Sequence, residues 1–122
     1  SAASDVYKRQ LEEGRDMVLV LETEGAMKVK SIYPTAISFF VAAPAFDLKA
    51  RMERTETTEK DRRNRLAQIR KEISMIPKYD YLIMNGNGML EKNIELVHNI
   101  IKGQKTRTSV NLDAIEKLRK EY

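Results

Sequence analysis

Three arginines in the middle of the chain, Arg51, Arg54 and Arg65, are the side chains best suited to chemistry. The first two lie in a charged segment rich in Thr and Glu, and Arg65 follows eleven residues after Arg54. A guanidinium group is always charged and grips phosphate oxygens in a bidentate fashion, so several arginines together neutralise the charge on a phosphoryl group. The pattern predicts a phosphoryl-transfer site. The alternative is a solvated helix face on which Glu59 and Asp61 brace the arginines.

Polar residues at the ends of expected strands form a second set of candidates. Glu22 follows the apolar run 17–21, and Asn85 follows the apolar run 81–84 just before a Gly-Asn-Gly turn. Parallel α/β sheets bind ligands at the carboxyl ends of their strands, so both positions suit a contact with substrate or metal. Gly25 would let a backbone N–H approach a ligand closely. Taken alone, Glu22 also fits a solvated charge and Asn85 also fits ordinary turn chemistry.

Apolar runs and helical periodicity alternate along the chain and place these candidates on elements. Short apolar runs bounded by charges or Pro predict strands at 16–22, 37–42 and 81–85. Apolar residues at helical spacing, with Pro34 and Pro77 as terminators, predict helices at 24–33, 46–52, 59–74, 90–101 and 112–121. Strands that alternate with helices predict an α/β fold with three parallel strands and flanking helices.

The composition limits the partners of the chain. The net charge of +4 comes from interspersed basic and acidic residues, and the most basic segment, 60–71, has no aromatic side chain. We therefore expect no nucleic-acid binding, and small anions such as nucleotides suit the charge better. No apolar stretch is long enough to span a bilayer, and residues 1–10 hold no secretory signal. We expect no membrane partner and a cytoplasmic protein, while the oligomeric state stays open.

Several kinds of site are excluded. His98 is the only histidine and the chain has no cysteine, so a histidine-based triad lacks a cysteine nucleophile and a zinc site lacks ligands. The chain also contains no G-x-x-x-x-G-K-S/T loop and no Gly-Lys pair. An enzyme that transfers phosphoryl groups from a nucleotide needs such a loop to cradle the phosphates.

Taken in order, five motifs resemble those of the guanylate kinases. Residues 19–26 (LVLETEGA) are similar to the family's L-D/E-I-D-x-Q-G-A, and residues 39–44 (FFVAAP) are similar to F-I-x-x-P. Residues 51–54 (RMER) and 65–67 (RLA) resemble the family's lid, written R-L-x-x-R-G and R-L. Residues 79–85 (YDYLIMN) are close to Y-D-Y-x-I-x-N-D.

The resemblance implies transfer of the γ-phosphoryl group of ATP to GMP, giving GDP and ADP, with Mg²⁺ accompanying ATP. It implies that Arg51, Arg54 and Arg65 contact the ATP phosphates and the transferring group. Glu22, which replaces the family's usual Asp, would lie with Gly25 on the Mg²⁺ and GMP side. Asn85 would lie near the adenine, although Gly86 follows it where the family has Asp, and no residue is assigned as a direct metal ligand.

The resemblance also implies a partial P-loop nucleoside-monophosphate-kinase fold. It covers Leu11 to Lys102, the C-terminal part of the core and lid, while 103–122 form a linker and a last helix. Residues 1–10 do not resemble the family and are expected to be foreign sequence. The phosphate-loop strand, central in the family's sheet, and the GMP-binding region are absent. We therefore expect a marginally stable fragment that is inactive alone.

The alternative to an enzyme is a non-catalytic guanylate-kinase-like domain that binds protein partners. Such domains tend to lose the arginines that bind ATP, whereas Arg51, Arg54 and Arg65 are all present in this chain. The resemblance therefore favours the enzyme.

Overall fold

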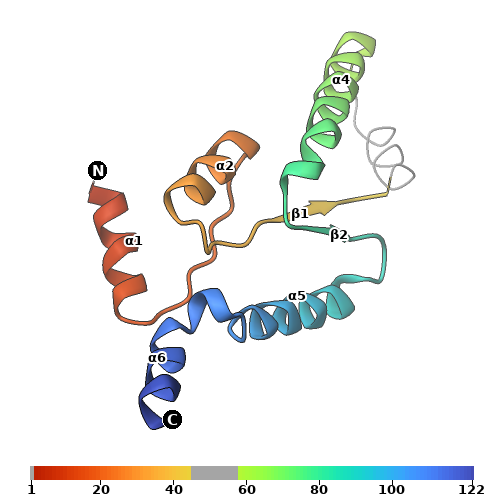
Figure 1. Cartoon of the computed structure of the whole chain (residues 1–122). Helices are drawn as coiled ribbons and strands as arrows, with labels where there is room; N and C mark the ends of the chain where they lie inside the picture. The colour runs from red at the N-terminus through yellow and green to blue at the C-terminus, as the bar shows by residue number, and fades with distance from the viewer. Residues whose placement is uncertain (1, 45–57) are drawn as a thin grey trace.

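The computed structural model describes residues 2–44 and 58–122, which form helices around a short parallel sheet (Figure 1). Helices and strands alternate along much of the chain, which confirms the α/β class. The expected helix at 46–52 lies outside the described residues. In chain order the elements are α1 (Ala2–Glu12), α2 (Thr23–Ile32), β1 (Phe39–Ala42), α4 (Glu59–Met75), η1 (Ile76–Lys78), β2 (Tyr81–Met84), α5 (Leu90–Gln104), η2 (Thr108–Val110) and α6 (Leu112–Glu121).

The sheet that the described residues form consists of β1 and β2, paired in parallel. Phe39 lies opposite Tyr81, and their rings stack with centroids 5.2 Å apart. At the far end of the pair the backbone N–H of Asn85 donates to the carbonyl of Ala42 at 2.7 Å. Two of the three predicted strands are thus confirmed, each slightly shorter than expected.

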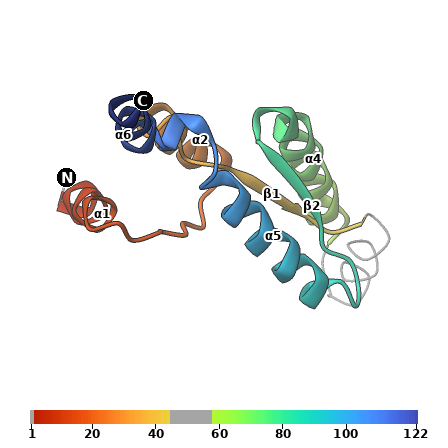
Figure 2. The ribbon, with the colours of Figure 1, turned by 60° about the horizontal axis from the view of Figure 1, so that its bottom comes forward.

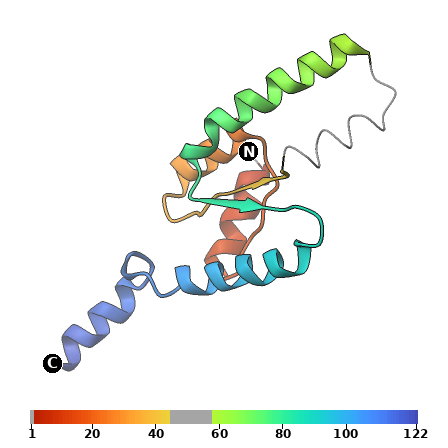
Figure 3. The ribbon, with the colours of Figure 1, turned by 90° about the vertical axis from the view of Figure 1, so that its right-hand side faces the viewer.

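Helices lie on both sides of this sheet. Figure 3 shows α5 below the strands and α2 and α4 above them. Figure 2 shows the same arrangement from another direction, with α5 and α4 on opposite sides of β1 and β2. Ile83 of β2 is the most buried apolar residue among those described, with 3% of its surface exposed.

Local chemistry sets the ends of the helices much as predicted. Thr58 caps α4, because its hydroxyl oxygen accepts a hydrogen bond from the N–H of Asp61 at 3.2 Å. Pro77 lies just after α4, within η1, and α2 ends at Ile32, two residues before Pro34.

The remaining predicted strand, 16–22, which is the first in chain order, is not confirmed. In the described part of the chain this segment connects α1 to α2 without regular structure. Val18 is 84% exposed and Val20 is 97% exposed. A strand is stable when neighbouring strands pair its backbone groups, and no described strand runs beside this segment. The apolar run is therefore present, but the described residues contain no strand that pairs with it.

The chain exposes much more surface than a compact protein of its size. Its accessible surface is 10431 Å², whereas a compact monomer of this mass exposes about 6,700 Å². In all three views α6 lies away from the strands, and it contributes to this surface (Figures 1 to 3).

We expect the purified chain to unfold with a midpoint below about 55 °C in a thermal melt followed by circular dichroism. The two-stranded sheet leaves backbone groups unpaired, at about 1 to 3 kcal/mol for each buried group, against a usual total stability of about 5 to 15 kcal/mol. A cooperative transition above about 55 °C would contradict this. As a matched pair, Ile83→Ala should abolish the transition, while Val20→Ala should shift stability by no more than about 0.5 kcal/mol.

Candidate functional site

Arg65 is the one lid arginine within the described residues, since Arg51 and Arg54 lie outside them. It projects from α4 and is exposed. The predicted ion pair with Asp61 is absent among the described contacts, because the ion pairs found there join other residues. Bracing by Asp61 therefore does not account for Arg65, and its guanidinium group remains accessible to an anionic ligand.

Glu22 occupies the position just before α2. Its backbone is extended there, and its carbonyl accepts the first helical hydrogen bond, from the N–H of Ala26 at 2.9 Å. Its side chain is exposed and does not cap the helix. The carboxylate is thus free of the usual capping role and accessible at the start of α2.

Gly25 lies in the first turn of α2. A Cβ atom built there would meet the side chain of Leu21 at 3.5 Å, which is ordinary van der Waals contact. Packing in the described chain does not by itself require glycine at this position. A close approach of a ligand, as the sequence predicted, is therefore still a prediction.

Asn85 is held at the carboxyl end of β2 by Asn93 of α5. The side-chain amide of Asn93 donates to the side-chain oxygen of Asn85 and to the carbonyl of Met84, both at 3.0 Å. Asn93 is only 8% exposed, so these hydrogen bonds are shielded from water. They fix the amide of Asn85 and leave its nitrogen without a partner among the described residues. That nitrogen can donate to an acceptor such as an adenine ring nitrogen.

Asn93 was not among the candidate residues predicted from the sequence. It lies three residues after Leu90 and four before Val97, on the apolar stripe of α5. A polar residue at a core position must satisfy its hydrogen bonds inside the protein, and this signal was available in the sequence.

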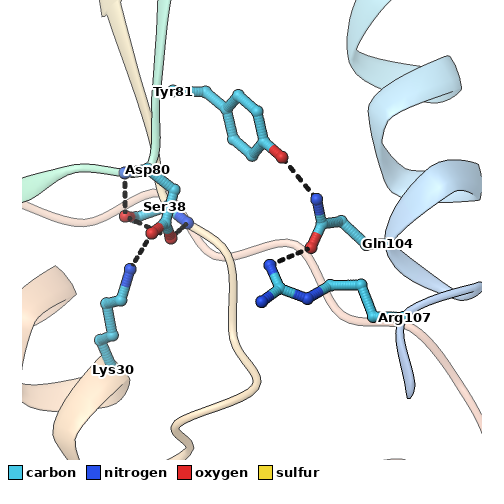
Figure 4. A network of polar contacts seen from close by, with 6 residues as sticks. All are labelled: Lys30, Ser38, Asp80, Tyr81, Gln104 and Arg107. Carbon is cyan, nitrogen blue, oxygen red and sulfur yellow. Dashed lines mark hydrogen bonds and ion pairs between the residues drawn. The ribbon is translucent and has the colours of Figure 1, made fainter. Parts of the chain in front are cut away.

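A polar network surrounds the opposite end of the sheet, where the strands begin (Figure 4). Asp80 pairs with Lys30 of α2 and accepts hydrogen bonds from the backbone N–H and the hydroxyl of Ser38, at 2.8 and 3.1 Å. Burial alone would raise the pKa of the Asp80 carboxyl, but the hydrogen bonds from Lys30 and Ser38 outweigh it and lower the pKa below its ordinary value. The carboxylate therefore stays charged and ties α2 to the start of both strands.

Figure 4 also shows a second polar chain that ties α5 to the same end of the sheet. Gln104 donates to the hydroxyl of Tyr81, and Arg107 donates to the side-chain oxygen of Gln104 at 3.4 Å. Both chains of contacts lie away from the carboxyl ends of the strands. Their role is therefore to support the sheet rather than to contact a ligand.

No group of three or more acidic or histidine side chains among the described residues is arranged to hold a metal ion. Within the same residues no helix has the length and apolar character needed to cross a membrane.

Comparisons with known proteins place the chain in one family. Residues 3–104 match the family model described as guanylate kinase, and the match begins ahead of the expected boundary at Leu11. A guanylate kinase of Syntrophus aciditrophicus is 40% identical over 105 residues, which are 85% of this chain and 50% of that protein.

Two further relatives are also guanylate kinases that match most of this chain and about half of their own length. A guanylate kinase of Thermotoga maritima is 32% identical over 91% of this chain and 54% of its own length. One of Caldanaerobacter subterraneus subsp. tengcongensis is 30% identical over 93% of this chain and 55% of its own length. The chain thus spans about half the length of the curated relatives it matches.

We expect Asp80→Asn to destabilise the chain at pH 7 by about 1 kcal/mol, measured by urea denaturation, because the charged partner of Lys30 is lost. The value is modest because 33% of the Asp80 side chain is exposed. Since the pKa is lowered in the folded state, this stabilisation is present above the unfolded pKa of 3.8 and is lost as the pH falls through the folded value.

The effect of Asp80→Asn should accordingly shrink as the pH falls below about 4. Glu95→Gln is the control, because Glu95 is exposed on α5 and makes no ion pair among the described residues. Equal effects of the two substitutions at pH 7 would show that the Asp80 network contributes nothing.

Proposed function

The chain belongs to the guanylate kinase family, and we propose that it is the part of a guanylate kinase that supplies the lid arginines and one wall of the nucleotide site. The reaction is transfer of the γ-phosphoryl group from Mg·ATP to GMP, giving GDP and ADP, in the purine nucleotide metabolism of the cytoplasm. The family match over residues 3–104 carries this proposal.

Arg51, Arg54 and Arg65 hold the ATP phosphates and the transferring group. Charge spreads over the oxygens of the phosphoryl group in the transition state, and guanidinium groups close to those oxygens neutralise it. No covalent intermediate with the protein is needed. The exposure of Arg65 and its lack of an ion pair with Asp61 support this role, because its guanidinium group is not already engaged by that neighbour.

Glu22, Gly25 and Asn85 contribute to the substrate side and the adenine side. Glu22 presents a carboxylate at the start of α2, where it faces the Mg²⁺ and GMP side, and the backbone at Gly25 lies in the same turn. Asn85, oriented by Asn93, directs its amide nitrogen toward the adenine.

The residues present fit an Mg²⁺ ion that arrives with the nucleotide. Mg²⁺ in such sites binds phosphate oxygens, several waters and one or two carboxylates, so it needs no cluster of protein ligands. Glu22 offers one exposed carboxylate at the start of α2. When bound, the ion neutralises phosphate charge; the protein's part is to place Glu22 beside it.

The chain alone is inactive under this proposal, because it contains no G-x-x-x-x-G-K-S/T loop. The missing function is supplied by sequence corresponding to the half of the relatives that this chain does not span.

The same sequence supplies a strand that pairs with residues 16–22 and with the open edge of β1. Two observations support this. The side chains of Val18 and Val20 are exposed although they are apolar, and among the described residues β1 pairs with β2 alone, which leaves its other edge open. A strand between these two segments would pair both and complete a parallel sheet.

The proposal is tested by expressing this chain as one polypeptide with the portion of the Syntrophus aciditrophicus guanylate kinase that it does not match. We call this the joined protein. It should form ADP from ATP only when GMP is present, while the chain alone should not. Arg65→Ala should lower kcat about 10³-fold, because it removes charge stabilisation of the transferring group.

Arg70→Ala is the matched control, since Arg70 is exposed on the same helix five residues further on. Its kcat should stay within about twofold of the parent, the range expected for a surface change. Equal losses for the two variants would contradict the role of Arg65. A folded joined protein that neither binds ATP nor forms ADP would instead favour the non-catalytic, protein-binding alternative.

A further inference from the structure

Two consecutive residues, Tyr79 and Asp80, contact both ends of α2. The hydroxyl of Tyr79 donates to the hydroxyl oxygen of Thr23, the first residue of α2, at 3.0 Å. Asp80 pairs with Lys30, in the last turn of the same helix (Figure 4). These partners are 56 and 50 residues apart in sequence. The contacts therefore fix the place of α2 against the sheet rather than the helix itself.

The side chain of Tyr79 is held in place by ring packing and by a backbone hydrogen bond. Its ring packs edge-on against Phe40 of β1, with centroids 5.2 Å apart and an interplanar angle of 82°. Its backbone N–H donates to the carbonyl of Ile76 at 2.9 Å. Because the ring, the strand and the preceding turn are connected, the hydroxyl has a defined position below α2.

The beginning of α2 depends on this contact more than most helix starts do. The side chain of Glu22 makes no capping hydrogen bond, so the usual local anchor of a helix N-terminus is missing. The hydroxyl of Tyr79, bonded to Thr23, anchors the first turn to the sheet from outside the helix. Glu22 is the residue immediately before Thr23, so the anchored first turn also limits where Glu22 lies.

We propose that Tyr79 is a positioning residue that, through Thr23, sets where Glu22 stands relative to the sheet and the bound GMP. This inference rests on the proposed function, because Glu22 acts on the Mg²⁺ and GMP side only in a guanylate kinase. Tyr79 itself touches no reacting atom. Its hydroxyl fixes the first turn of α2 against the residues that lead into β2.

The test compares Tyr79→Phe with Tyr33→Phe in the joined protein. Tyr33 directly follows α2 and its hydroxyl makes no hydrogen bond among the described residues, so both changes remove one hydroxyl beside the same helix. Tyr79→Phe should raise KM for GMP about fivefold and leave KM for ATP unchanged, the scale of one lost hydrogen bond. Tyr33→Phe should change neither.

A merely structural role predicts a different result, in which Tyr79→Phe lowers the amount of active enzyme and leaves KM for GMP unchanged. That outcome, or equal effects of the two substitutions, would overturn the proposal. Tyr79→Ser keeps a hydroxyl but on a side chain too short to reach Thr23. An unchanged KM for GMP in this variant would overturn the proposal as well.

Hydrogen exchange on the chain by itself separates this inference from the proposed function. Tyr79→Phe should speed exchange of the amide of Ala26, which makes the first helical hydrogen bond of α2, about fivefold, and leave the amides in the middle of α5 unchanged. If the joined protein is inactive but this local change is seen, the proposed function fails and the anchoring of α2 stands. If exchange in α2 is unaffected, the anchoring itself is wrong, whatever the activity of the joined protein.

Discussion

The parallel pairing of β1 with β2 is the interaction on which the rest of the described structure depends. It joins segments more than 40 residues apart, with Phe39 opposite Tyr81 and Ala42 opposite Met84. Each neighbouring helix is then attached to one of these strands or to the residues beside them. The hydrogen bonds of Asn93 and Gln104 attach α5, and those of Tyr79 and Asp80 attach α2.

The two ends of this strand pair differ in their chemistry. Where the strands begin, Asp80, Lys30 and Ser38 form a charged network whose partners are all within the protein. Where the strands end, Asn85 is oriented by Asn93 and keeps donor capacity for a ligand. In parallel α/β sheets ligands bind at the carboxyl ends of the strands, which is the end where Asn85 lies.

Sequence patterns predicted the elements that depend on local chemistry. The ends of α4 follow from Thr58 and Pro77, and α6 occupies the predicted residues 112–121. The strand at 16–22 failed because an apolar run looks the same in a sequence whether or not a partner strand is present.

The residues of the candidate site also divide into those that local sequence patterns reveal and those that depend on distant contacts. Arg65 is exposed on α4 and its role stays a prediction, while Glu22 directly precedes α2 although the strand predicted before it is not formed. The contact between Tyr79 and Thr23 could not be predicted from sequence patterns, because no local pattern connects residues 56 positions apart. The buried Asn93 was within reach, as a polar residue on an apolar helix stripe.

Under the proposed function, the two-stranded sheet is an incomplete sheet whose open edge and residues 16–22 take up one further strand. The most direct measurement is hydrogen exchange of the amides of residues 17–21, in the chain alone and in the joined protein. We predict rapid exchange in the chain alone and protection of at least about 100-fold in the joined protein, as for a paired strand. Equally rapid exchange in both proteins, with the joined protein folded, would show that residues 16–22 do not pair with a further strand.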